Sequence, residues 1–179
     1  MTDAYALISK YYSDNPPLLE ILTVHSELVA EKALRCLDAH PELSLDRQFV
    51  YEAAMLHDIG IFLTDAPSIH CHGQGHYLSH GLLGAELLRK EGLPRHARVA
   101  ERHTGTGLTV RQIEERGLPL PHRDFLPETL EEQLVCFADK FFSKTDLRQE
   151  KTTARIEKSL SRFGEDCVER FREWQLLFG

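Results

Sequence analysis

Six side chains of the kinds that bind divalent metals are spread over most of the chain, each in a segment predicted to be a helix or a helix end. They are His25, His57, Asp58, His80, His103 and Asp139. Neutral imidazole and carboxylate groups suit hard and borderline divalent cations. His57 and Asp58 directly follow an apolar stretch, and two ionisable groups are costly to bury unless they are paired or bind a metal. A fold that buries this pair must therefore supply it with partners or with a metal.

The adjacent His-Asp pair limits how such a site can be built. Neighbouring residues on a helix point about 100° apart, so the pair can line the edge of a pocket but cannot point the same way. Asp58 could then bridge two ions. We expect His25 and Asp139 to complete one ion site, and His80 and His103 to supply the second. In hydrolases of this type, two ions about 3.5–4 Å apart clamp a phosphate and hold a bridging hydroxide as the nucleophile.

The spacing of apolar residues predicts helices along the whole chain. The expected helices cover residues 3–12, 16–39, 46–59, 79–91, 95–103, 109–116, 127–142, 152–163 and 166–177. Asn15 and Asp46 are suitable N-caps, and Gly60 is a suitable helix breaker. We therefore expect an all-α fold, a compact bundle in which residues 1–179 form one domain. The last two helices, within residues 150–178, hold no candidate ligand and are expected to serve as scaffold or as an oligomer contact, for example in a homodimer.

The composition argues against several other classes of protein. With 179 residues, 42% of them hydrophobic, the chain is long enough to bury a core. The net charge of −7 argues against a protein that coats nucleic acid, although it allows a local basic pocket. No apolar run approaches the roughly 20 residues that span a membrane, and the first residues lack the features of a signal peptide. We therefore expect a cytoplasmic protein whose four scattered cysteines are free thiols.

The order of the six residues on a helical chain resembles that of the HD superfamily of metal-dependent phosphohydrolases. The stretch Leu56–Gly60 closely matches the motif that names the HDIG subgroup, and the resemblance covers about residues 20–145. It implies an HD-type helical core with the site at its centre and a first ion held by four residues. These are His25, His57, Asp58 and Asp139. His80 and His103 match the additional histidines of two-metal members, which include symmetrical diadenosine-tetraphosphate hydrolases and cyclic-dinucleotide phosphodiesterases.

One difference from the family concerns the general acid. Several of its phosphodiesterases have a lysine shortly after the HDIG motif, whereas Ile61 stands here and no lysine lies between Gly60 and Lys90. Residues 61–77 show no periodicity, and we expect them to form a lid over the substrate with glycines as hinges. The candidate acids in this segment are Asp65, His70, His72 and His76. A histidine that titrates near neutrality suits proton transfer, although each of them could equally be an exposed loop residue. A separate zinc site on Cys71 and its two flanking histidines is disfavoured, because no second ligand pair lies at the usual spacing.

Substrate phosphates would also need cationic and polar partners. The candidates are Arg98, Arg102, Thr104, Thr106, Lys140 and Lys144. The arginines precede His103 and the lysines follow Asp139, so both pairs would lie near the ligands. The threonines belong to a turn with two glycines that could present hydroxyls and open backbone amides to an anion. The alternative for the arginines is ordinary solvated helix charge.

We therefore expect a hydrolase that cleaves a phosphoester or phosphoanhydride of a small metabolite, a nucleotide. It would use one or two ions of iron, manganese or another transition metal. The first alternative is a di-iron oxygenase, because inositol oxygenase and a phosphonate-cleaving oxygenase of the same superfamily use the same ligand set. The second is a non-catalytic signalling module, and the presence of all six ligands argues against it.

Overall fold

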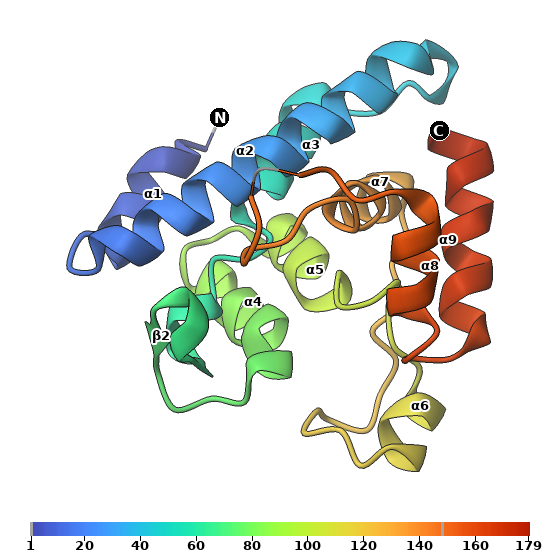
Figure 1. Cartoon of the computed structure of the whole chain (residues 1–179). Helices are drawn as coiled ribbons and strands as arrows, with labels where there is room; N and C mark the ends of the chain where they lie inside the picture. Colours follow the sequence, from blue (N-terminus) through green and yellow to red (C-terminus); the bar gives the residue numbers. More distant parts are fainter. Residues whose placement is uncertain (1, 148) are drawn as a thin grey trace.

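The structure is a computed structural model that describes residues 2–147 and 149–179, and it confirms the predicted all-α architecture (Figure 1). The helices are α1 (Ala4–Tyr12), α2 (Pro16–Ala39), α3 (Arg47–Leu56), α4 (His80–Lys90), α5 (Pro94–Arg102), α6 (Val110–Glu115), α7 (Leu130–Asp139), α8 (Thr153–Leu160) and α9 (Glu165–Phe178). Two short strands, β1 (Asp65–Ala66) and β2 (Cys71–His72), pair in antiparallel fashion. Single turns of 3-10 helix lie at Pro41–Leu43, Ile61–Leu63, Pro67–Ile69 and Tyr77–Ser79.

Polar caps determine where the helices begin. The side chains of Asp3, Asn15 and Asp46 accept hydrogen bonds from backbone N–H groups in the first turns of α1, α2 and α3. These N–H groups have no partner within their own helix, so each cap stabilises a helix start. The starts predicted for these three helices are therefore confirmed.

The boundaries of α7 differ from the prediction of a helix over residues 127–142. The helix begins at Leu130, because Thr129 and Glu132 form a reciprocal capping box in which each side chain binds the other residue's backbone N–H. It ends at Asp139, so the aromatic residues Phe141 and Phe142 lie in the segment that follows. The last residue of α7 is thus one of the six predicted ligands.

The helices pack around a single long element. Helix α2 crosses the molecule and packs against α3 and α7, while α4 packs against α5 and α9 lies beside α7 and α8 (Figure 1). Helices α2 and α3 pack against each other, and each contributes small buried residues to the core, among them Ala33 and Ala53. A smaller apolar cluster of Leu108, Ile113 and Phe125 lies around α6, at the bottom of the same view.

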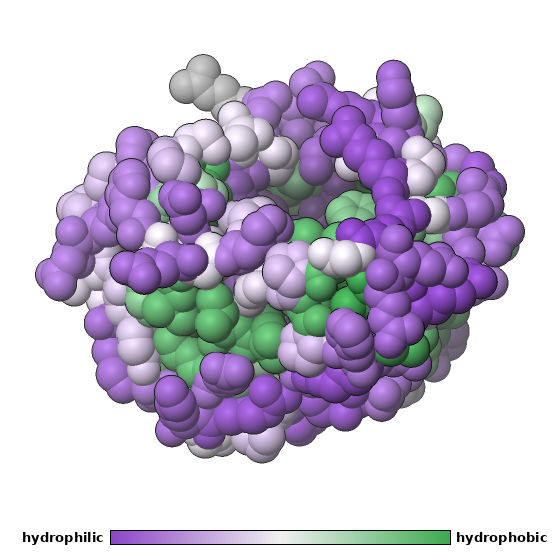
Figure 2. Space-filling model, turned by 90° about the horizontal axis from the view of Figure 1, so that it is seen from below, coloured by the Kyte–Doolittle hydropathy of each residue, from purple (hydrophilic) through white to green (hydrophobic). Residues whose placement is uncertain are grey.

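The surface is mostly polar. Seen from below, hydrophilic residues form the rim of the molecule and hydrophobic residues show in the central part of this face (Figure 2). Within the described residues, no helix is both long enough and apolar enough to pass through a bilayer.

The segment of residues 61–77, predicted to be an irregular lid, is an ordered hairpin. Asp65 pairs with His72 in the sheet, and the Asn15 side chain at the start of α2 donates a hydrogen bond of 2.9 Å to the carbonyl oxygen of His70. A Cβ atom at Gly73 would lie 2.2 Å from the carbonyl carbon of Leu63, so this position requires glycine for close packing. Gly73 therefore has a packing role in this conformation, and its role as a hinge stays a prediction.

Candidate metal centre

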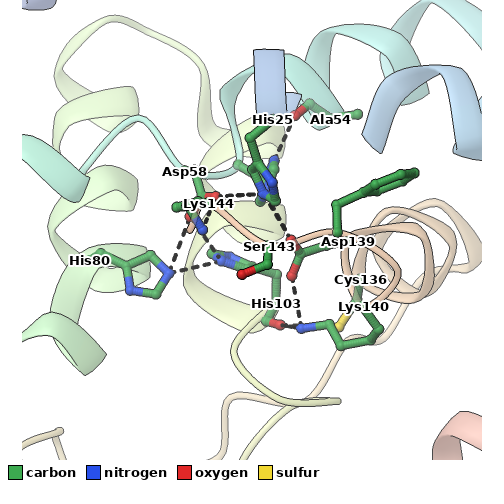
Figure 3. Close-up of polar contacts among 12 residues, drawn as sticks. His25, Ala54, Asp58, His80, His103, Cys136, Asp139, Lys140, Ser143 and Lys144 are labelled. Carbon is green, nitrogen blue, oxygen red and sulfur yellow. Dashed lines mark hydrogen bonds and ion pairs between the residues drawn. The ribbon is translucent and has the colours of Figure 1, made fainter. Parts of the chain in front are cut away.

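Five segments of the chain converge on a buried centre that contains all six predicted ligands (Figure 3). They contribute His25 from α2, His57 and Asp58 from the turn after α3, His80 from the start of α4, His103 after the end of α5, and Asp139 from the end of α7. The exposed fraction of these residues ranges from 0% for His57 and Asp58 to 9% for Asp139. Groups this polar are costly to bury unless each has a hydrogen-bond partner, an opposite charge or a metal.

The ligand atoms form two groups that share one carboxylate. The first group is His25, His57, Asp58 and Asp139, and the second is Asp58, His80 and His103. Within each group the ligand atoms all lie within 4.8 Å of one another. Asp58 joins the groups, because its Oδ2 lies 3.0 Å from His57 Nε2 and its Oδ1 lies 3.3 Å from His80 Nε2. Each oxygen of this carboxylate is therefore directed at a different set of histidines.

Backbone carbonyl groups fix the orientation of three histidine rings. The Nδ1 atoms of His57, His80 and His103 lie 2.6, 2.6 and 2.7 Å from the carbonyl oxygens three residues earlier in the chain. Because a carbonyl oxygen can only accept, each Nδ1 carries the hydrogen. In the neutral rings, Nε2 is then the atom with a free lone pair, and it is directed at the centre.

The resulting arrangement fits a bound cation. His80 Nε2 and His103 Nε2 are 3.0 Å apart, and they lie 3.3 and 3.4 Å from Asp58 Oδ1. With neutral rings, none of these three atoms has a hydrogen to donate. Asp58 Oδ1 is buried without a hydrogen bond from any described residue, whereas Asp58 Oδ2 already pairs with the Lys144 ammonium at 2.5 Å. Converging acceptors repel one another unless a cation lies among them, so this set of nitrogen and oxygen donors suits a divalent metal.

Neighbouring charges keep the carboxylates ionised. Burial opposes ionisation of Asp58, but Lys144 and His57 hold the pKa of its carboxyl group well below the usual value. Despite its burial, Asp139 also has a pKa well below the usual value, because of the adjacent lysine and the histidines. Burial disfavours a charged His57, yet the two carboxylates raise the pKa of this ring to about 9. Burial dominates at His103 and lowers its pKa to about 4.

Two lysines lie against the carboxylates. Lys144 Nζ is 2.5 Å from Asp58 Oδ2. Lys140 Nζ is 2.9 Å from Asp139 Oδ2 and donates a hydrogen bond of 2.9 Å to the carbonyl oxygen of His103. Burial disfavours both charges, but the adjacent carboxylates raise the pKa of each lysine, so both are cationic at neutral pH. Figure 3 shows both lysine side chains directed toward the ligand cluster.

A cavity of about 390 Å³ opens beside the centre. This volume falls in the range of small-molecule sites, roughly 300–1,000 Å³. His25, Asp139, Lys140 and Lys144 line it together with Tyr77, whose ring stacks on that of His80 with 4.8 Å between ring centres. Of the six residues predicted to contact phosphate, the two lysines line this cavity.

The other four predicted phosphate contacts do not line it. Arg98 pairs with Glu128 and Glu132, and the buried Arg102 also pairs with Glu128, so carboxylates outside the cavity engage both arginines. The hydroxyl of Thr106 is buried and donates a hydrogen bond of 3.0 Å to the carbonyl oxygen of Cys167. Thr104 is half-buried in the same turn, and the adjacent Gly105 lines the cavity in its place.

The four candidate acids lie on the outer side of the hairpin. Asp65, His70, His72 and His76 are exposed, and the cavity lining does not include them. His76 has a local role instead, since its Nδ1 accepts a hydrogen bond from the backbone N–H of Leu78. Among the described residues, Cys71 and its flanking histidines do not form a metal-binding group, because Cys71 is fully buried and both histidines are exposed.

Sequence reasoning missed six polar residues of the cavity, which are Ser68, Tyr77, Ser143, Thr145, Lys151 and Ser159. Lys151 Nζ donates hydrogen bonds to the carbonyl oxygens of Phe142 at 2.6 Å and of Lys140 at 3.4 Å, and burial lowers the pKa of this lysine. Ser68 and Lys151 belong to no local motif and reach the cavity only through folding. Tyr77 could have been found from the sequence, because it stands three residues before His80. The backbone carbonyl group at that position orients the His80 ring.

Comparisons with known proteins agree with this geometry. A family model described as the HD domain matches residues 22–143. A tRNA (cytidine(56)-2'-O)-methyltransferase of Picrophilus torridus is 36% identical over 125 residues, which are 69% of this chain and 32% of that protein. An uncharacterized protein of Methanocaldococcus jannaschii is 35% identical over 143 residues, which are 79% of this chain and 75% of that protein. The crystal structure of the HD domain of the L. monocytogenes phosphodiesterase PgpH superposes with a TM-score of 0.56 at 20% identity, covering 93% of both chains.

These matches differ in how much they establish about this chain. The chain spans about a third of the length of the P. torridus methyltransferase, and its likeness to the PgpH domain is one of fold. The matched family segment, in contrast, covers more than half of the chain and contains all six clustered ligands, from His25 to Asp139. The chain therefore belongs to the HD superfamily of metal-dependent phosphohydrolases.

Proposed function

We propose that this protein hydrolyses a phosphoester or phosphoanhydride of a small metabolite, a nucleotide, with the help of two divalent ions. The observation that carries the proposal is the shared carboxylate of Asp58. One of its oxygens faces His57 and the other faces His80 and His103, beside a cavity of small-molecule size. Such a pair of sites is the arrangement that holds two ions next to each other.

The balance of charge at the centre favours an anionic substrate. The two carboxylates of Asp58 and Asp139 are matched by the ammonium groups of Lys140 and Lys144, which lie 2.5–2.9 Å from them. Binding of each divalent ion would therefore make the net charge of the centre positive. A cavity lined by positive charge attracts anions, and a phosphate group gains more from it than a neutral substrate does.

The ligand set suggests which metals would bind. His25, His57, Asp58 and Asp139 would hold the first ion, and Asp58, His80 and His103 the second. Imidazole and carboxylate donors suit iron and manganese. Divalent ions in such sites lower the pKa of water and neutralise charge on the phosphate.

The residues of the chain would orient the substrate around these ions. Lys144 and Lys140 line the cavity as cations, and we propose that they hold phosphate oxygens. Neither Lys144 nor Tyr77 is a ready proton donor at neutral pH, because the pKa of each is raised above its usual value. We therefore propose that solvent water protonates the leaving group, in place of the exposed histidines of the hairpin.

The test begins with metal analysis of protein purified without added metal. Phosphate release is then followed over a panel of nucleotides, phosphomonoesters and phosphodiesters, with manganese in air or iron(II) without oxygen. We expect metal-dependent hydrolysis that is lost in His103→Ala. His72→Ala is the matched control, because this histidine is exposed and outside the cavity, and it should keep the wild-type rate.

Three results would count against the proposal. Oxygen consumption without phosphate release would favour the di-iron oxygenase that shares this ligand set. Failure to bind any transition metal would remove the basis of the mechanism. A strong loss of rate in His72→Ala with unchanged metal content would return the hairpin histidines to the role of general acid, because proton donation contributes about 10²–10⁴-fold.

A further inference from the structure

One wall of the cavity comes from a part of the chain beyond the HD match. The matched segment ends at residue 143, whereas α8 and the turn after it contribute Ile156, Ser159, Leu160 and Phe163 to the lining. We call these four residues the α8 wall. The spacing of Ile156, Ser159 and Leu160 places them on one face of α8, this face is turned toward the cavity, and Phe163 continues the lining from the turn after the helix. The C-terminal region thus takes part in the site, in addition to any role as scaffold.

The chemistry of the α8 wall differs from that of the metal side. Three of its side chains are apolar and the fourth is a hydroxyl, so the wall carries no charge. On the metal side, the cavity is lined by His25, Asp139 and the lysines. Ile69 and Ser68 of the hairpin repeat the combination of an apolar side chain and a hydroxyl. In the view of Figure 1, this hairpin and α8 lie on opposite sides of α5.

The wall is held in a fixed position. The Thr152 side chain caps the start of α8, and the Gln112 side chain donates a hydrogen bond of 3.1 Å to the carbonyl oxygen of Phe163. The turn at Gly105 packs beside the Phe163 ring, at a distance where a Cβ atom would make an ordinary contact of 3.8 Å. Ile156 and Leu160 are packed into the main core. A preformed apolar surface of this kind binds a rigid apolar group without having to order itself first.

We propose that the α8 wall binds the nucleoside part of a nucleotide substrate and so determines specificity. The base would lie against the apolar side chains of the α8 wall and Ile69, while the ribose hydroxyls would meet Ser159 and Ser68. The phosphate would point to the lysines and the ions, so this inference rests on the proposed function. An apolar wall contributes nothing to the binding of a bare phosphate or a polyphosphate, whereas burial of a planar base contributes favourable free energy. Specificity then comes from the chain beyond residue 143, and the ions are held by the matched segment.

The test uses one substitution at two positions. Both serines are exposed, but only Ser159 lines the cavity, so Ser159→Phe places a large ring in the lining and Ser161→Phe places the same ring outside it. Nucleoside 5′-monophosphates and ribose 5-phosphate are compared as substrates with manganese. We expect the nucleotides to have a KM at least about tenfold lower than that of ribose 5-phosphate. Ser159→Phe should remove this preference, and Ser161→Phe should keep it.

A binding measurement separates this inference from the proposed function. Calorimetry with an unphosphorylated nucleoside should detect binding to the wild type and to Ser161→Phe, and a loss of at least about tenfold in affinity for Ser159→Phe. Hydrolysis of ribose 5-phosphate as efficient as that of the nucleotides, in wild type and Ser159→Phe alike, would overturn the inference and leave the hydrolase in place. Nucleoside binding that Ser159→Phe blocks, without hydrolysis of any phosphoester, would support the α8 wall and reject the proposed reaction. Absence of nucleoside binding together with absence of substrate preference would reject the wall as a nucleoside site.

Discussion

The glycine that ends the HDIG motif determines how closely α4 approaches the metal centre, and Gly60→Ala tests this. A Cβ atom at Gly60 would lie 2.3 Å from the carbonyl oxygen of His80, 2.4 Å from the nitrogen of Gly84 and 2.7 Å from its Cα atom. All three are backbone atoms, so no side-chain rotation can relieve the overlap. To restore an ordinary contact of 3.4 Å with the nearest atom, α4 must move by about 1 Å. His80 begins this helix and must move with it.

The magnitude of the effect follows from this displacement. Overpacking costs about 1–3 kcal/mol, and a clash with three backbone atoms belongs at the upper end, near 3 kcal/mol. For a chain of this size, 1 kcal/mol corresponds to about 2–4 °C, so Tm should fall by about 6–12 °C. Metal bonds tolerate deviations of about 0.2 Å, so the ion held by His80 should be lost. The first ion site contains no residue of α4 and should remain.

The assay measures thermal unfolding and metal content in three variants. Gly84→Ala meets the same contact from the other helix with 3.0 Å to the nearest atom, so its fall in Tm should be smaller. Gly92→Ala meets nothing within 4 Å but has a φ of +76°, so it should lose some stability through backbone strain and keep both ions. A Gly60→Ala protein that melts at the wild-type temperature and binds two ions would refute the reasoning.

Three further predictions concern other parts of the structure. Asp58→Ala should lose both ions and about 3–5 kcal/mol of stability, because Lys144 stays buried without its carboxylate; adding Lys144→Met should restore stability in urea titrations but not metal content. Thr129→Ala should cost about 1 kcal/mol in the same titrations by removing the cap of α7, with metal content unchanged. Burial lowers the pKa of His96 below its usual 6.5 despite Glu52, so the stability that the neutral ring contributes is present above pH 6.5 and is lost as pH falls through the lowered pKa. His96→Gln should therefore flatten the dependence of stability on pH between about 7 and 5. An unchanged slope would contradict the lowered pKa of His96.

The helices and the six clustered histidine and aspartate residues were predictable from local patterns. Caps such as Asn15 and Asp46 act within one turn of their own helix, so the sequence alone marks them. The ligands could be recognised for a different reason, because burying Asp58 in an apolar segment demands compensation wherever the segment lies. The grouping around Asp58 expected from the sequence is the grouping that the structure places within bonding reach.

The environment of the cavity could not be predicted in the same way. The arginines before His103 carry the charge that a phosphate needs, yet they pair with Glu128, before α7, and Glu132, in its first turn. The histidines of the hairpin have suitable chemistry but face outward, since strand pairing and the contact of Asn15 with His70 fix the hairpin. Tertiary packing decides which of two chemically suitable side chains lines the cavity. A local sequence pattern therefore cannot predict it.

The position of Lys144 follows from the ends of helices. Relatives that carry a lysine after the HDIG motif would supply it from the segment that follows α3, where this chain has the apolar, buried Ile61. Here α7 ends at Asp139, and the lysine five residues later lies with its Nζ 2.5 Å from Asp58 Oδ2. A buried carboxylate requires a cation nearby but does not specify the segment from which it comes. The helix boundary at residue 139 therefore matters for function, because a helix continued to residue 142, as the apolar pattern predicted, would carry Lys144 along the axis of α7 and away from Asp58.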